Sequence, residues 1–485
     1  MLVNLYASRV ILKHLGITDF GIYNVVGGFV SMFSIISNAL TTGITRFITF
    51  EIGSNNLENL KKVFSTSVII QIIISLILLV LVETFGVWFL NNHMTIPSDR
   101  MVAANWVLQF SAITFCINLI SIPFTADLIA HEHMKIYAYI TIADAILKLA
   151  ICFLLSYSPI DYLVTYSILM MMVAVTIRFT YSAYCSSHFE ECKFQLNFDK
   201  KYFWQMASFS GWNMIGSSSA VLRDYGVNVL INIFYGPIAN AARGIAMQVS
   251  NAVQCFSNSF IMAINPQITK SYAANKVKES IDLAFWGSRI TYYLLFLIAL
   301  PFLIETKKIL QIWLSQVPQY SIIFVRLIVI YVLAECVSYT LVTLMLATGK
   351  IRNYQIVVGG CQMLNFPISY FILYKGASPE LTIAISILIA LLCLMLRLYM
   401  LKRMIGLPIL DYCKSVLANC LVVSIVSLIP PFVIRLSLEN EIIQSLLTFI
   451  ICIGSVVLSI AIVGLNKVER IIVFKFIKNK LKITI

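Results

Sequence analysis

The chain has 485 residues, of which 60% are hydrophobic and 12% charged, with a formal net charge of +13 and a mean hydropathy of +0.89. These values exclude a soluble globular domain and indicate a polytopic membrane protein. The basic residues gather in alternate loops and in the tail, a membrane-orientation pattern, so the net charge does not indicate nucleic-acid binding.

The N-terminal segment MLVNLYASRVILKHLG is apolar for only about a dozen residues and contains Arg9. At 1.5 Å per residue it spans less than two thirds of a hydrocarbon core of about 30 Å. We therefore expect Met1 to lie inside the first transmembrane helix, with the front half of that helix missing.

Thirteen further apolar runs follow, which with the partial first helix predicts about fourteen transmembrane helices. They cover residues 22–48, 66–90, 102–126, 136–156, 161–184, 204–234, 238–265, 284–304, 321–347, 354–374, 380–401, 412–434 and 441–464. A tight turn is expected at Tyr235-Gly236-Pro237, between the sixth and seventh runs of this series. Connections after even-numbered helices are rich in lysine and arginine, which predicts that both termini are cytoplasmic.

The chain also resembles itself when shifted by about 220 residues. Leu15-Gly16 aligns with Tyr235-Gly236, and Ser37-Asn38 aligns with Ser257-Asn258. An even number of helices per repeat predicts two halves inserted in the same sense, with a site between them. We expect an N-lobe over 1–200 (helices 1–6), a C-lobe over 201–405 (helices 7–12), and helices 13–14 with a basic cytoplasmic tail over 406–485.

Charged side chains inside apolar runs are the main functional signal, because a charge at bilayer depth usually faces a wet cavity or a partner. Arg223, Asp224 and Arg243 lie in the segments on either side of the expected turn. The alternatives are that Arg223 and Asp224 neutralise neighbours and that Arg243 extends to the nearer surface.

His131 and His133 lie two residues apart with Glu132 between them, and no third histidine or cysteine lies near in sequence. A solvated loop is the favoured interpretation over a metal site. The sequence contains no P-loop, GxSxG or HExxH motif, so we expect no metal, no cofactor and no catalytic residue.

Several segments resemble one family. They are LGITDFGIYNVVGGFVSMFSIISNALTTGITRFITFEIG, IAHEHMK, FSGWNMIG, GPIANAARGIAMQVSNAVQCFSNSFIMAINPQITKSYA, IWLSQVPQY and LATGKIRNY. They are similar to the polysaccharide-biosynthesis (O-antigen type) flippases of the multidrug/oligosaccharidyl-lipid/polysaccharide (MOP) transporter superfamily. The resemblance implies an all-α, MATE-like fold: two six-helix lobes around a central, often cationic cavity, plus two C-terminal helices.

The resemblance further implies a bacterial inner-membrane flippase that moves an undecaprenyl-pyrophosphate-linked O-antigen, capsule or exopolysaccharide repeat unit by alternating access. Its expected partners are this lipid-linked oligosaccharide, membrane lipids and polysaccharide polymerase or assembly proteins. A MATE-type multidrug or cation antiporter, a lipid II flippase and a membrane glycosyltransferase or polymerase remain alternatives. The first would favour acidic and aromatic cavity residues over arginine, and the last would need a sizeable outward loop.

Arginine suits a pyrophosphate because its guanidinium stays charged and matches phosphate oxygens. We predict substrate contacts in the central cavity from these residues: Arg223, Arg243, Arg9, Arg46, Asn228, Asn240 and Asn258. The asparagines could equally pair between helices, and Arg46 could anchor a cytoplasmic helix end. Candidates for binding a coupling proton or cation are Glu83, Glu335 and Asp224.

Overall fold

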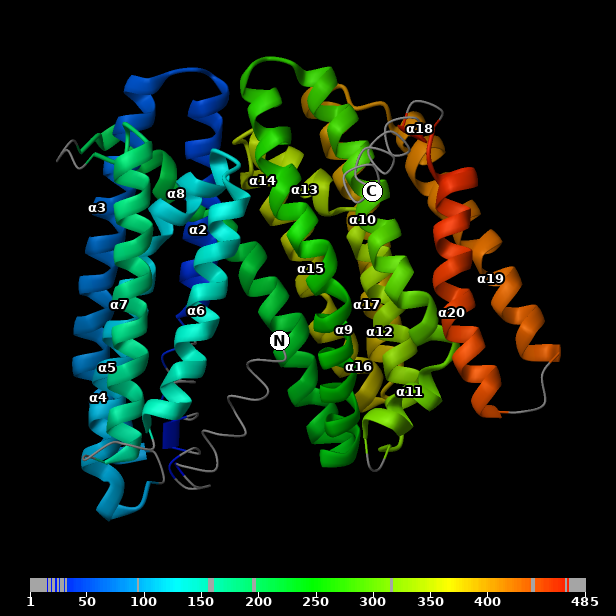
Figure 1. The fold of residues 1–485 in the computed structure, drawn as a ribbon, viewed down its shortest axis with the longest axis horizontal. Coiled ribbons are helices and arrows are strands. Elements are labelled where there is room, and N and C mark those ends of the chain that lie inside the picture. Colours follow the sequence, from blue (N-terminus) through cyan, green and yellow to red (C-terminus); the bar gives the residue numbers. More distant parts are fainter. Residues whose placement is uncertain are drawn as a thin grey trace, which may run out of the picture. The chain divides into compact units, whose positions relative to one another are not determined.

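The computed structural model describes residues 33–93, 96–155, 161–193, 198–314, 317–437, 441–466 and 469–470, together with Leu15, Asp19, Ile22, Tyr23, Val26 and Val30. Within this described part the chain is almost entirely helical and contains no strand (Figure 1). The predicted all-α class is confirmed. Contacts divide the chain into two compact units, Met1–Ser217 and Ser218–Ile485.

The first unit is a bundle of long helices. Its elements are α2 (Ser34–Gly53), α3 (Leu57–Leu81), a π-helical turn (Val82–Gly86), α4 (Val87–His93), a short 3₁₀ turn (Ser98–Arg100), α5 (Met101–Ala130), α6 (Met134–Leu154), α7 (Tyr162–His188) and α8 (Lys200–Val221), whose last residues belong to the second unit. Helix α5 is central and packs against α7, α3 and α2.

Two helices of this unit, α3 and α7, begin with a side-chain cap. The side chain of Asn56 accepts a hydrogen bond from Asn59 N at 3.0 Å at the start of α3. Asp161 accepts from the backbone nitrogens of Leu163 and Val164 at the start of α7. These side chains satisfy backbone N–H groups that have no partner inside their own helix.

The second unit contains α9 to α20. Its elements are a π-helical turn (Leu222–Gly226), α9 (Val227–Ala273), α10 (Val277–Ile304), α11 (Thr306–Trp313), α12 (Ser321–Cys336), α13 (Tyr339–Ala347), α14 (Arg352–Tyr354), a π-helical turn (Gln355–Gly359), α15 (Gly360–Met363), α16 (Asn365–Tyr374), α17 (Leu381–Ile405), α18 (Ile409–Tyr412), a π-helical turn (Cys413–Ala418), α19 (Asn419–Ser437), α20 (Glu441–Ser459) and a final π-helical turn (Ile460–Gly464).

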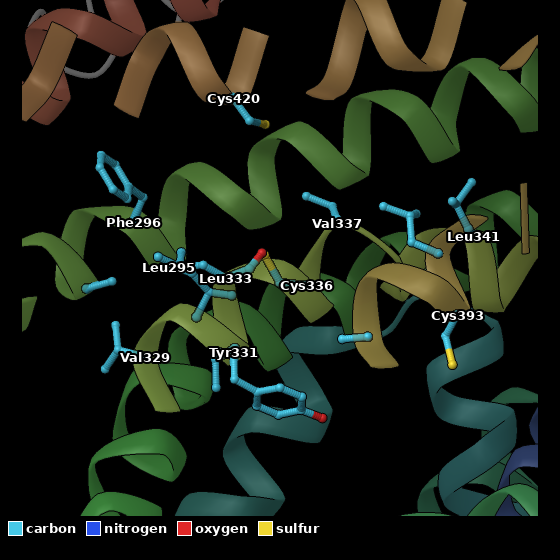
Figure 2. Packing of buried hydrophobic residues seen from close by; sticks show 14 of the residues in the cluster. Leu295, Phe296, Val329, Tyr331, Leu333, Cys336, Val337, Leu341, Cys393 and Cys420 are labelled. Atoms are coloured by element: carbon cyan, nitrogen blue, oxygen red, sulfur yellow. The ribbon is translucent and has the colours of Figure 1, made fainter. Parts of the chain in front are cut away.

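The core of the second unit lies between α10, α12 and their neighbours. Figure 2 shows Leu295 and Phe296 of α10 near Val329 and Leu333 of α12. Small residues allow close helix approach here: a Cβ added at Gly287 would lie 2.8 Å from Thr340 Cγ2. Beside it, the Ser288 and Thr340 hydroxyl oxygens are 2.7 Å apart. Such small and hydroxyl-bearing contacts are typical of packing between membrane helices.

In the described part of the chain, nine helices are long and apolar enough to cross a membrane. They run over Leu57–Asn92, Ser98–Ala130, Tyr162–His188, Val277–Ile304, Ser321–Ala347, Arg352–Tyr374, Leu381–Ile405, Ile409–Val433 and Leu447–Gly464. The chain is therefore a multi-pass membrane protein. The total of fourteen stays a prediction, as do the internal repeat and the boundaries at 200 and 405.

Helix α9 is continuous in its backbone pattern, but it does not run straight. Nη2 of Arg243 lies 3.4 Å from the carbonyl oxygen of Arg223, whereas twenty residues of straight helix would separate them by about 30 Å. Val227 and Ala239 also belong to one buried cluster. The chain therefore reverses between Arg223 and Arg243, where the sequence predicts a turn at Tyr235-Gly236-Pro237, although the reversal keeps helical backbone geometry.

Candidate functional site

A π-helical turn places two charged residues in the second unit. The segment Leu222–Gly226 lies between α8 and α9 and contains Arg223 and Asp224. Gly226 allows close packing there, since a Cβ at this position would lie 2.8 Å from Phe366 Cδ2. Single π-helical turns inside α-helices are frequent at functional sites because they re-aim side chains.

Two carboxylates hold Arg223. Its Nε and Nη2 donate to Asp224 Oδ1 and Oδ2 at 2.8 and 3.1 Å. Its Nη1 donates to Glu335 Oε1 at 3.2 Å, across 112 residues of sequence. The Arg223 side chain is 14% exposed and that of Asp224 is 32% exposed, so Asp224 is the more accessible side of the pair.

Helix α12 supplies Glu335 together with Tyr331, four residues earlier on the same face. The Arg223 guanidinium carbon lies 5.4 Å from the centre of the Tyr331 ring, within the range of a cation–π contact. Tyr331 is buried in the core of the unit (Figure 2). Tyr331 was not among the residues predicted from the sequence, although its spacing from Glu335 in an apolar run was a usable signal.

Arg243 completes the cluster, and its side chain has no carboxylate partner within the described residues. Its Nη2 reaches the carbonyl oxygens of Arg223 and Asp224 at 3.4 and 3.5 Å. Its Nε and Nη1 are buried without any hydrogen-bond partner in that part of the chain. The residue is only 4% exposed. Arg223 and Arg243 therefore lie together in the structure. Their contact with substrate stays a prediction.

The other predicted asparagines and arginines fall in different surroundings. Asn228 has a buried Oδ1 with no hydrogen-bond partner among the described residues, and Asn258 is exposed. Arg46, in the first unit, lies 4.7 Å from the rings of Phe47 and Phe50. Arg9 and the side chain of Asn240 lie outside the residues that the structure describes.

The three candidates for ion coupling also differ in their surroundings. Asp224 and Glu335 both bind Arg223, so a cation at either carboxylate would compete with that guanidinium. Glu83 is exposed in the π-helical turn Val82–Gly86 of the first unit. Coupling through any of them stays a prediction.

Solved structures share this fold. A MATE protein in its straight conformation has a TM-score of 0.71 at 12% identity, covering 84% of this chain and 92% of that chain. A MOP superfamily transporter from Pyrococcus furiosus has a TM-score of 0.70 at 10% identity, covering 84% of this chain and 92% of that chain. Its binding pocket is described as having reverse polarity. The Vibrio cholerae MATE transporter VcmN, in a mutant form, has a TM-score of 0.68 at 15% identity, covering 83% and 92%.

At 10–15% identity, the likeness to these solved structures shows a shared fold. The profile of the polysaccharide biosynthesis protein family matches residues 2–272, more than half of the chain. The chain belongs to the polysaccharide biosynthesis protein family. No curated protein matches it in sequence.

Proposed function

We propose that this protein is a transporter of the flippase type, which moves undecaprenyl-pyrophosphate-linked oligosaccharide across the bacterial inner membrane by alternating access. The observation that carries the proposal is Arg243, a buried guanidinium with two nitrogens left without partners among the described residues. Membership of the polysaccharide biosynthesis family supports a saccharide substrate.

Burying a charge without a partner costs several kcal/mol. An unpaired internal cation is therefore best explained by an anionic ligand that pairs with it. A pyrophosphate linker offers oxygens that accept charge-assisted hydrogen bonds from guanidinium nitrogens. On this chain's side of that contact the donors are Arg243 Nε and Nη1, which have no hydrogen-bond partner among the described residues. Asn228 Oδ1, which also lacks a partner in the described part of the chain, can accept from a sugar hydroxyl.

Arg223 has a conditional role in this mechanism. Its ion pairs with Asp224 and Glu335 must both break before its guanidinium can bind an anion with its full charge. Asp224 is the more exposed of the two carboxylates, so it is the one that an entering pyrophosphate displaces. A proton or metal cation bound at Asp224 or Glu335 would have the same effect and would couple ion binding to substrate binding.

The second candidate is a MATE-type cation antiporter, favoured by one observation: Asp224, Glu335 and Tyr331 form an acidic and aromatic group. Such a group attracts a lipophilic cation. In that case Arg223 is the internal counter-ion that the drug replaces, and Arg243 has no contact with substrate.

Transport in reconstituted vesicles separates these functions. Wild-type chain, Arg243→Met and the matched control Arg289→Met are each tested with undecaprenyl-pyrophosphate oligosaccharide and, separately, with a lipophilic cation. Arg289 is a suitable control because it is also buried but binds Glu469. The proposal predicts saccharide translocation by wild type and control, and a loss of about tenfold or more in Arg243→Met, the size expected for charge-assisted hydrogen bonds. Cation efflux without saccharide translocation would establish the antiporter instead.

The proposed function also includes an orientation of the chain in the membrane and a class of protein partner. Both termini lie in the cytoplasm, as the basic loops indicate. Polymerase or assembly proteins that act on the translocated repeat unit are the expected protein partners.

A further inference from the structure

Five chemistry-bearing side chains meet at one end of the first unit. Asp127 and His131 lie one turn apart at the end of α5, and Cys185 lies in the last turn of α7. Glu191 and Cys192 follow in the turn after α7. The sequence favours a solvated loop at His131. The fold, however, places two cysteines and two carboxylates beside it. Three of these four side chains belong to residues more than 50 positions away along the chain.

Four of the five side chains are buried, and His131 is partly exposed. Asp127 and Cys185 are fully buried, and Glu191 and Cys192 are 4% and 2% exposed. Cys185 Sγ, Cys192 Sγ and a carboxylate oxygen of Asp127 all lie within 4.8 Å of one another. The same holds for Asp127, His131 and Glu191, so Asp127 is common to both sets.

Asp127 is incompletely satisfied. Cys192 Sγ donates to its Oδ2 at 3.2 Å, but its Oδ1 is buried with no hydrogen-bond partner among the described residues. His131 Nε2 lies 3.9 Å from that Oδ1, and it is instead 2.6 Å from Glu191 Oε1. The ring of His131 stacks on Phe189 with centroids 4.2 Å apart. A buried carboxylate oxygen without a donor is costly unless something positive meets it.

We propose that Asp127, Cys185 and Cys192 bind one divalent cation of the zinc class, with His131 as the fourth donor. Zinc–ligand bonds of about 2.0–2.3 Å place the donors of a tetrahedral site about 3.3–3.8 Å apart. Cys192 Sγ lies 3.2 Å from Asp127 Oδ2, and His131 Nε2 lies 3.9 Å from Asp127 Oδ1, so the two distances bracket this range. Binding releases the two thiol protons, and His131 exchanges its contact with Glu191 for the metal.

The donor chemistry selects the cation. Two thiolates and an imidazole suit zinc and other soft or borderline metals, whereas magnesium and calcium prefer all-oxygen sites. The metal would connect the ends of α5 and α7 to the turn that contains Phe189 and Cys192. It would therefore stabilise the first unit.

Metal binding by the full-length chain in detergent tests the site. Protein stripped with a chelator is incubated with Zn²⁺ alone or Co²⁺ alone, and bound metal is measured after gel filtration. We expect one equivalent of zinc, thiolate-to-cobalt charge-transfer absorption, and a rise in melting temperature. Cys192→Ser and Asp127→Asn should weaken binding by more than about 100-fold, since losing a supporting group alone costs about 10- to 100-fold.

The matched control is Cys116→Ser. Cys116 is another buried cysteine of the same unit, on α5, where its thiol donates to the Ser75 carbonyl oxygen. This variant should keep the metal and the cobalt spectrum. Glu191→Gln should keep them too, whereas His131→Ala should weaken binding.

Two results would overturn the proposal, and both are read on the wild-type chain, so a misfolded variant cannot obscure them. One is a wild-type chain that takes up no metal and gives no cobalt–thiolate band. The other is that Cys185 and Cys192 of the wild-type chain react with a thiol reagent only after the protein has been reduced. That result would assign them to a disulfide.

Discussion

Nη2 of Arg243 donates to the carbonyl oxygen of Arg223 at 3.4 Å, which joins the two arginines across the reversal inside α9. The carbonyl belongs to the π-helical turn Leu222–Gly226, so Arg243 supports the turn whose arginine side chain lies between Asp224 and Glu335. Nε and Nη1 of Arg243 have no hydrogen-bond partner among the described residues. A ligand bound to them would therefore act directly on the segment that positions Arg223. Substitutions in this turn and in the helices that support it should have separable effects on stability and on transport.

Replacing Gly226 with alanine should destabilise the second unit. The added Cβ would lie 2.8 and 3.1 Å from Phe366 Cδ2 and Cε2, and overpacking of this kind costs about 1–3 kcal/mol. Thermal unfolding in detergent measures the loss. The control is Gly244→Ala on α9, where an added Cβ meets nothing within 4 Å. A further Phe366→Leu change should restore part of the stability of Gly226→Ala; if it does not, the clash is not the cause.

Asp224→Asn should increase apparent affinity for the pyrophosphate-linked substrate. The change removes the negative charge that holds Arg223 Nε and Nη2, while Glu335 still satisfies Nη1. A gain of about tenfold is expected, because charge-assisted hydrogen bonds contribute about 1.5–3 kcal/mol. Translocation rate against substrate concentration gives the affinity. Asp144→Asn, which removes the ion pair with Lys148 in the first unit, should leave it unchanged. Loss of translocation in Asp224→Asn would instead indicate that this carboxylate binds a coupling ion.

The first unit should lose stability in acid through Asp161. Burial favours the neutral carboxyl group, but the Arg100 guanidinium at 2.5 Å and the Val164 backbone N–H outweigh it and lower the pKa of Asp161 below its ordinary value. A lowered pKa stabilises the fold above the unfolded value of about 3.9, and this contribution is lost as the pH falls through the folded value.

Asp161→Asn separates charge from capping, since asparagine is also a good N-cap residue. It should melt below wild type at neutral pH, and the gap should close in acid. Asp161→Ala should lose about 1 kcal/mol more at every pH, because it also removes the cap. A gap between wild type and Asp161→Asn that does not change with pH would exclude the ion pair as its origin.

Topology can be read from two exposed turns of the second unit. Asn275 follows α9 and Ser378 follows α16. By the distribution of basic residues, Asn275→Cys should be protected from an impermeant thiol reagent in intact cells and Ser378→Cys should react. The parent chain with its native cysteines gives the background. The reverse pattern would invert the proposed orientation, and equal labelling would contradict the assignment of the helices between the two turns.

The all-α membrane class of the protein and the positions of several of its helices could be predicted from residue order alone. Whether a segment crosses a membrane depends on about twenty consecutive residues, so the apolar runs of α3, α5 and α17 could be located without tertiary information. The ion pair between Asp144 and Lys148 is equally local, because residues four apart meet on any helix. The reversal near Tyr235-Gly236-Pro237 was indicated by its turn residues, although not its helical geometry.

Which distant side chains meet depends on how the helices pack in three dimensions. A helix that is apolar on all sides has no polar stripe to distinguish one face from another, so its sequence does not fix which face turns toward which neighbour. The pairing of Arg223 with Glu335 and the convergence of Asp127, Cys185 and Cys192 depend on that rotation. Side-chain identity along the chain therefore gave the candidates, and helix packing in three dimensions selected their partners.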